Sequence, residues 1–213
     1  MAPLLIPSVP RLYSTCNWLD GTPGVPITLQ SVFRSYSWNK PIFHATLGGS
    51  ADVLAKMSDR AYGVKVHVFL SRQGFASKLF GICTLEGLPT LYVMEKLDGS
   101  WISLMAWQES VESERRATAR AEIEEGIEQI LGLLAREGYV HGDLPPCNIM
   151  VCKNSLKLNV IDFDWAGEAD WTRYPFGRNE DIKEWPSGSA PGGVISAMHD
   201  RELVGNWGAR FLV

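Results

Sequence analysis

The stretch HGDLPPCN at residues 141–148, followed by VIDFD at residues 160–164, decides how the rest of this chain is interpreted. The residues between these two motifs begin with an apolar run, pass through Lys-Asn-Ser and then alternate apolar with polar side chains. That pattern predicts a β-hairpin with its tip at Asn154 or Ser155.

The hairpin is expected to gather side chains that bind a cation. An antiparallel pairing about that tip sets Ile149 opposite Ile161 and so places Asn148 beside Asp162, since neighbouring strands lie roughly 5 Å apart. Amide and carboxylate oxygens are hard ligands, which suit a magnesium ion shared with phosphates better than zinc or copper. Asp143, on the same loop, is left to face a substrate as a base or an orienting group.

The two motifs resemble the catalytic loop and the metal-binding motif of the protein-kinase-like superfamily. Gly142 makes them more similar to the aminoglycoside and choline phosphotransferase branch than to protein kinases proper, which carry an arginine there. The resemblance implies that Asp143 is the catalytic base, that Asn148 and Asp162 hold metal, and that His141 supports the loop. Asn148 thereby joins Asp143 in the catalytic set, and the implied cofactors are ATP and Mg²⁺.

Upstream, short apolar and β-branched runs predict strands over residues 27–36, 41–47, 51–57, 77–83 and 91–95, with a hairpin turn at residues 47–50. The resemblance implies that Lys56 contacts the α- and β-phosphates; from the residues alone, a solvated lysine at a strand end is the alternative. It also implies that Met94 borders an adenine pocket whose backbone contacts come from Glu95 and Leu97. No Gly-x-Gly-x-x-Gly motif precedes Lys56.

Residues 61–73 support two interpretations. Alternating valines predict a strand, whereas the resembling family has a helix there that ends at Gly74. In that helix a glutamate normally pairs with the strand lysine, but Lys65 or Val64 stands in its place. His67, alone among valines, is expected to be a packed polar group rather than a ligand.

Periodic apolar residues predict a long helix over residues 110–137, with Ser110 as its N-cap and Gly138 at its exit. A last short helix is expected to begin at His199. Only about 50 residues follow Asp162, so the helical subdomain that completes the resembling fold is expected to be abbreviated or missing. Asp164 is interpreted either as a residue of the metal site or as a surface carboxylate.

The resemblance therefore implies an α+β, two-lobed protein-kinase-like fold. Residues 1–26 form an irregular leader, residues 27–97 the antiparallel-sheet lobe, and residues 98–213 the mainly helical lobe. A net charge of -4 does not indicate the positively charged surface with which proteins bind nucleic acid. Four scattered cysteines and the lack of a long apolar run predict a cytoplasmic protein in a reducing compartment, with no membrane association.

Two functions compete. The first is an ATP- and Mg²⁺-dependent phosphotransferase acting on a hydroxyl of a small molecule or a protein. The second is a catalytically impaired pseudokinase that binds nucleotide or a protein partner, which Lys65, Pro145 and the short helical lobe favour.

Overall fold

The computed structural model describes residues 13–19, 24–34, 41–177 and 185–211. The described chain forms two compact units. Residues 1–61 and 77–96 contribute to the first, and residues 62–76 and 97–213 to the second. The second unit thus takes residues 62–76 from within the segment that the sequence assigns to the first lobe.

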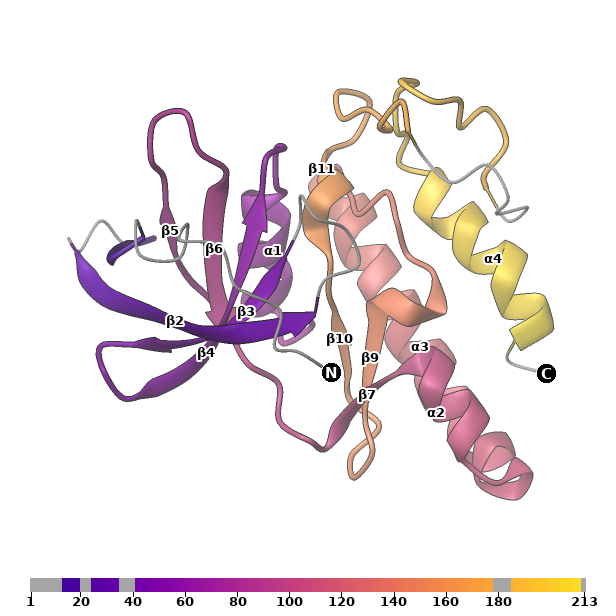
Figure 1. Ribbon diagram of the computed structural model, residues 1–213. Coiled ribbons are helices and arrows are strands. Elements are labelled where there is room, and N and C mark those ends of the chain that lie inside the picture. The colour runs from indigo at the N-terminus through magenta and orange to yellow at the C-terminus, as the bar shows by residue number, and fades with distance from the viewer. Residues whose placement is uncertain (1–12, 20–23, 35–40, 178–184, 212–213) are drawn as a thin grey trace. The chain divides into compact units, whose positions relative to one another are not determined.

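The first unit is antiparallel, as expected, but its strands close into a barrel (Figure 1). Its strands are β1 Thr15–Trp18, β2 Val25–Arg34, β3 Ile42–Leu47, β4 Ala51–Ser58, β5 Leu79–Cys83 and β6 Thr90–Glu95. They are joined in the order β1-β2-β3-β4-β6-β5, and the pairing of β1 with β5 closes the barrel. The predicted turn after β3 is confirmed: Leu47 pairs with Ala51, and Gly48 and Gly49 take positive φ angles of 62° and 79° that suit glycine.

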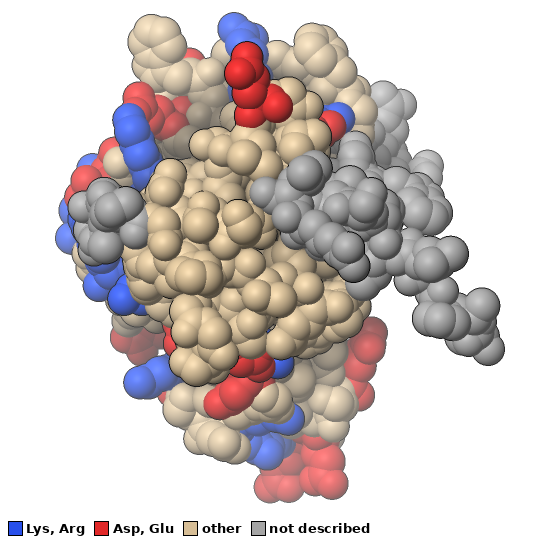
Figure 2. All heavy atoms as spheres, turned by 60° about the vertical axis from the view of Figure 1, so that its left-hand side comes forward, with Lys and Arg blue, Asp and Glu red and all other residues tan. Residues whose placement is uncertain are grey.

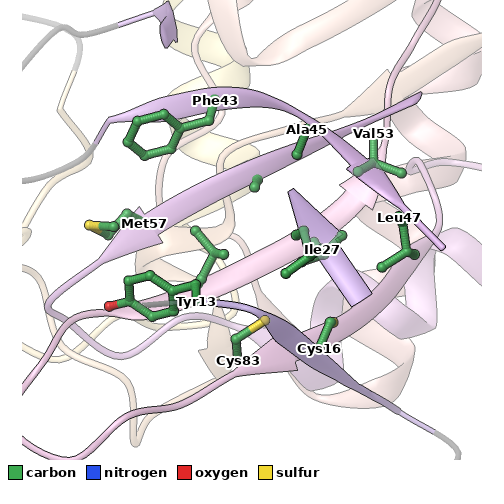
Figure 3. Close-up of a cluster of buried hydrophobic side chains, with 12 residues drawn as sticks. Tyr13, Cys16, Ile27, Phe43, Ala45, Leu47, Val53, Met57 and Cys83 are labelled. Atoms are coloured by element: carbon green, nitrogen blue, oxygen red, sulfur yellow. The ribbon is translucent and has the colours of Figure 1, made fainter. Parts of the chain in front are cut away.

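Alternation along the strands supplies the barrel core (Figure 3). On β3 the buried residues are Phe43, Ala45 and Leu47, which lie two apart because successive side chains of a strand point to opposite faces. The other strands add apolar residues from the same interior, including Val53 and Val93. The interior is therefore apolar, and the opposite face of each strand remains for polar groups.

The chain before β2 is more regular than its prolines suggest. Residues 15–18 were expected to belong to an irregular leader, but they form β1, which hydrogen-bonds to β2 and β5. Trp18 packs edge-on against Phe80 at a ring distance of 5.8 Å. Long-range backbone pairing overrides the weak local pattern here. Val25 and Pro26, at the end of the expected leader, already belong to β2. Residues 1–12 and 20–23 of that leader lie outside the described residues.

The second unit is mainly helical. Its helices are α1 Val64–Arg72, α2 Leu104–Ser110, α3 Ser113–Glu137 and α4 His199–Phe211, with two short 3₁₀ turns, η2 Pro146–Asn148 and η3 Phe163–Trp165. Its strands are β7 Trp101–Ser103, β8 Tyr139–Val140, β9 Ile149–Cys152, β10 Leu158–Val160 and β11 Gly167–Glu168. They make one sheet in the order β10-β9-β7 and one β11-β8 pair.

Helix α3 is the long helix that the apolar periodicity predicts. Ile123, Ile127, Ile130 and Leu134 are all buried on one face, and Gly138 ends the helix in the left-handed conformation with φ 68°. The predicted N-cap is wrong, because Ser110 is the last residue of the separate helix α2 and Glu112 precedes α3.

Residues 64–72 form the helix α1 rather than a strand. Val66, His67 and Leu70 are its buried residues. Leu70 follows His67 by three positions and Val66 by four, which places all three on one face of a helix. Valine is only weakly unfavourable in helices, so packing of this face overrides the alternation.

Charged side chains of both signs lie around the margins of one face of the molecule (Figure 2). Figure 2 shows lysine and arginine lying near aspartate and glutamate at the margins of one face, around a centre of uncharged residues. Across the described ranges, no helix has the length and apolar character needed to cross a membrane.

Candidate active site

The predicted hairpin exists, but its register differs by one residue from the prediction. Ile149 pairs with Val160, not with Ile161, because the connection runs from Cys152 to Lys157 and Cys152 accepts the amide hydrogen bond of Leu156. The carbonyl of Asn148 accepts the N–H of Ile161 at 3.0 Å, so Asn148 lies opposite the residue just before Asp162. The two motifs are thus brought to one end of the hairpin.

Asp143 and Asn148 are joined directly. The Asn148 amide nitrogen donates to both the carbonyl and the carboxylate Oδ2 of Asp143, each at 3.1 Å. The pKa of Asp143 is raised to about 7, mainly by burial and next by the negative charge of Asp162; the hydrogen bond from Asn148 opposes this increase, and Asp200 and Asp164 add to it. Several carboxyl groups therefore converge around one loop without a matching positive charge among these contributions.

The backbone of the catalytic loop is held by a carboxylate from α4. Asp200 accepts the N–H of His141 at 2.6 Å with Oδ2 and that of Gly142 at 2.8 Å with Oδ1. Burial raises the pKa of Asp200 to about 6, although both backbone hydrogen bonds oppose the change. The bidentate contact fixes the chain direction just before Asp143.

Gly142 is required by the loop geometry. Its φ is 78°, and a Cβ there would lie 2.8 Å from Ile195 Cδ1 and 3.0 Å from the Trp165 carbonyl oxygen. An arginine, as in protein kinases proper, does not fit this conformation. The glycine on which the branch resemblance rests thus has a local steric cause.

His141 acts inside the loop, as expected from the resemblance. Its Nδ1 accepts the N–H of Asp143 at 3.3 Å, and its Nε2 lies 3.1 Å from the carbonyl oxygen of Ile161. These contacts fit the neutral tautomer with the proton on Nε2. The imidazole therefore ties the two motifs together and does not face a substrate, since it is fully buried.

Helix α4 holds the loop at a second point. The Trp207 indole N–H donates to the carbonyl of Leu144 at 2.8 Å. Trp207 lies seven residues after Asp200, so both side chains project from the same face of the helix. Sequence reasoning missed both residues; the only local signal was an acidic residue in the first turn, which ordinarily indicates helix capping.

Asp162 has an unusual backbone conformation. Its φ and ψ are 68° and 63°, the left-handed region that non-glycine residues rarely enter, and its side chain is exposed. Phe163, directly after it, stacks on His67 at 4.4 Å and meets His141 edge-on at 5.1 Å. His67 is hydrogen-bonded to Tyr62 Oη at 2.8 Å, so it is the packed polar group that was expected.

Lys65 has a carboxylate partner. Its ammonium lies 2.9 Å from Glu168 Oε1 of β11, and this hydrogen bond raises the pKa of Lys65. Both side chains are largely exposed, which makes the pair weak. Lys65, which stands at the place of the family's glutamate, thus forms an ion pair of its own with Glu168.

The predicted nucleotide residues lie mostly on adjacent strands of the barrel. Lys56 is a buried residue of β4 and pairs with Tyr92, while Met94 and Glu95 end β6. Ala55 and Val93, the sequence neighbours of Lys56 and Met94, point into the apolar core. Successive side chains of a strand alternate between its faces, so Lys56 and Met94 face away from the core. Leu97 begins the return of the chain to the second unit, and the structure does not bring it into the same unit as the other three.

The predicted metal ligands fit a hard divalent cation. Asn148 uses its amide nitrogen toward Asp143, and its amide oxygen, which accepts a long contact of 3.9 Å from the Cys147 thiol, is the atom that would bind the metal. Asp162 offers an exposed carboxylate. The neighbouring carboxylates that help to raise the pKa of Asp143 carry negative charge that a divalent cation would offset. Within the ranges that the structure describes, no group of three or more His, Cys, Asp or Glu side chains has metal-site geometry.

An antiparallel barrel, a helical unit and a loop of this geometry define a protein-kinase-like fold of the α+β class, as predicted. The Cydia pomonella granulovirus kinase PK-1 matches with a TM-score of 0.68 at 14% identity, over 87% of this chain and 68% of that one. The structure of vaccinia related kinase 3 matches with a TM-score of 0.63, also at 14% identity, over 99% of this chain and 69% of that one.

The family model of the lipopolysaccharide kinase (Kdo/WaaP) family matches residues 86–184, slightly less than half of the chain. This range contains the catalytic loop and Asp162. No curated protein matches the sequence. Together these findings support a place in the protein-kinase-like superfamily and a phosphotransferase of the kinase class; the aminoglycoside and choline branch is not confirmed.

Proposed function

We propose that the protein is an ATP- and Mg²⁺-dependent phosphotransferase that transfers the γ-phosphate to a hydroxyl group of a small molecule or a protein. The observation that carries this proposal is the position of Asp143. Its backbone is fixed on one side by Asp200 through His141 and Gly142, and its carboxylate is held by Asn148 at 3.1 Å. Phosphoryl transfer depends mainly on such positioning.

Each residue has a separate task in this proposal. Asp143 orients the acceptor hydroxyl and receives its proton. Asn148 and Asp162 hold Mg²⁺, which neutralises the charge of the phosphates when it is bound. Lys56 contacts phosphate, and the backbone at Glu95 and Leu97, beside Met94, receives the adenine.

The branch and the acceptor are part of the proposal. Gly142 agrees with small-molecule phosphotransferases because no arginine fits at its φ of 78°. The name of the matched family makes lipopolysaccharide the first acceptor to test, with aminoglycosides and choline as the next choices.

Nucleotide binding is tested by thermal unfolding with ATP, with and without Mg²⁺. A ligand that binds only the folded state raises the unfolding temperature. Asp162→Asn should remove the Mg²⁺-dependent part of this rise, while its backbone remains possible because asparagine tolerates positive φ. Asp170→Asn is the matched control: Asp170 is exposed and has a similar φ of 65°.

Turnover is tested by release of phosphate from ATP. Asp143→Asn should abolish release yet keep the nucleotide-dependent rise in unfolding temperature, whereas Asp170→Asn should retain both. Equal rates of phosphate release in the wild type and in Asp143→Asn would refute the enzymatic proposal. A nucleotide-dependent rise without turnover in the wild type would favour the pseudokinase alternative.

A further inference from the structure

Two cysteines lie face to face inside the barrel. Asn17 pairs with Ile82 and Trp18 with Gly81, so the next position of this antiparallel register sets Cys16 opposite Cys83. Both side chains are buried in the same apolar cluster, with 2% and 4% of their surface exposed (Figure 3). Their thiols are hydrogen-bonded to each other.

The position of this pair in the ladder is favourable for a disulfide. The N–H of Leu19 donates to the carbonyl of Phe80, so residues 19 and 80, and with them residues 17 and 82, are hydrogen-bonded pairs. Cys16 and Cys83 stand one position beyond Asn17 and Ile82, where the alternation of an antiparallel ladder places a non-hydrogen-bonded pair. In such pairs the Cα atoms are about 4.5 Å apart, which is within the range that disulfides span.

The lack of a side chain at Gly81 leaves space for the Cys16 sulfur. A Cβ placed on Gly81 would lie 2.6 Å from Cys16 Sγ, so this sulfur occupies the space that a side chain at residue 81 would fill. The hydrogen bond with Cys83 lowers the pKa of Cys16 and raises that of Cys83. Cys16 is accordingly the better nucleophile of the two.

We infer that Cys16 and Cys83 form a reversible oxidation site that a hydroperoxide converts into a disulfide between β1 and β5. The Cys16 sulfur attacks the peroxide O–O bond, giving a Cys16 sulfenic acid and releasing an alcohol, or water when the oxidant is hydrogen peroxide. The Cys83 sulfur then attacks the sulfenic sulfur and displaces water. Two thiols lose two electrons and two protons in total, and the peroxide is reduced.

The site is reached through the strand that closes the barrel. β1 is only four residues long and pairs through two residue positions with each neighbour. Brief separation of so short a strand admits a small peroxide to the buried thiols. The bond that results secures β1 covalently and so holds the barrel closed.

The experiment uses the folded full chain treated with hydrogen peroxide. Cys147 and Cys152 are the more accessible thiols, and a Cys147→Ser/Cys152→Ser variant leaves only the pair in the barrel. After free thiols are alkylated, peptides from a non-reducing digest are identified by mass spectrometry. We expect a Cys16–Cys83 linked peptide that disappears on reduction, and an unfolding temperature higher by about 5 °C or more in the oxidised form.

The matched control adds Cys83→Ala to the same background, and it should give neither the linked peptide nor the higher unfolding temperature. The wild type compared before and after reduction gives the same information if the control fails to fold. The inference is overturned if both barrel thiols stay alkylatable after a peroxide treatment that oxidises Cys147 in the wild type. It is equally overturned if the link forms only when peroxide is added to denatured protein.

Discussion

Replacement of Asp200 by asparagine tests how α4 controls the catalytic loop. The carboxylate accepts two backbone N–H groups, from His141 and Gly142. An amide has one oxygen, so Asp200→Asn leaves one of these donors facing an NH₂ group. A buried donor without an acceptor costs about 1–3 kcal/mol, and we expect the free energy of unfolding at pH 7 to fall by that amount.

The loss should also depend on pH. Burial raises the pKa of Asp200 from 3.8 to about 6, so the folded state takes up a proton more readily than the unfolded state. The wild type is therefore stabilised as pH falls through 6, and this contribution disappears again as pH rises above 6. Linkage gives about 1.4 kcal/mol between pH 7 and pH 5 for this group. Asparagine does not titrate, so the destabilisation by Asp200→Asn should be larger at pH 5 by that amount.

The measurement is urea unfolding of both proteins at pH 5 and pH 7. Glu122→Gln, an exposed carboxylate of α3, is a control that removes one charge but keeps Asp200. It should follow the wild type at both pH values. A loss of stability in Asp200→Asn that is identical at pH 5 and pH 7 would contradict the reasoning, because it would mean that the buried carboxyl titrates as it does in the unfolded chain.

Three further substitutions test the loop. Trp207→Phe keeps an aromatic ring but removes the donor to the Leu144 carbonyl, so it should lower the free energy of unfolding in urea by about 1 kcal/mol and slow phosphate release from ATP. Gly142→Ala places a Cβ at φ 78°, and this backbone strain alone should lower the free energy of unfolding by about 1–3 kcal/mol, with a further loss from the overlaps with Ile195 and Trp165. An unchanged urea midpoint would refute the steric argument. Asp143→Asn removes a buried carboxyl group whose pKa is raised to about 7 and which is therefore costly to keep ionised at pH 8. Calorimetry at pH 8 should find the variant more stable by about 1–3 kcal/mol, since its amide oxygen keeps the contact with Asn148.

Sequence reasoning recovered most elements because their patterns are local. Alternation of side chains is set by the strand itself, so β3 and β4 were predicted within a residue or two of their ends. The face of α3 follows from the helical repeat in the same way. Where packing competes with pattern, as in α1, sequence alone left strand and helix open.

The hairpin marks the limit of such reasoning. Its strands were predicted, but the pairing of Ile149 with Val160 instead of Ile161 depends on how the connection closes at Cys152 and Lys157. A change of one residue in register alters which groups meet. Hence Asn148 was expected beside Asp162, whereas its amide nitrogen is bound to Asp143.

The amino-acid order by itself determined the class of fold, since HGDLPPCN and VIDFD point to it, and it suggested the chemistry that is proposed for the loop. Only the tertiary structure decided what holds the loop in place. Asp200 lies 59 residues after His141 and Trp207 lies 63 residues after Leu144, distances along the chain over which no periodicity extends. The pairing of Cys16 with Cys83 was decided in the same way, by the closure of the barrel. Contacts of this kind depend on how the elements pack, and each element's own sequence specifies only which face it buries.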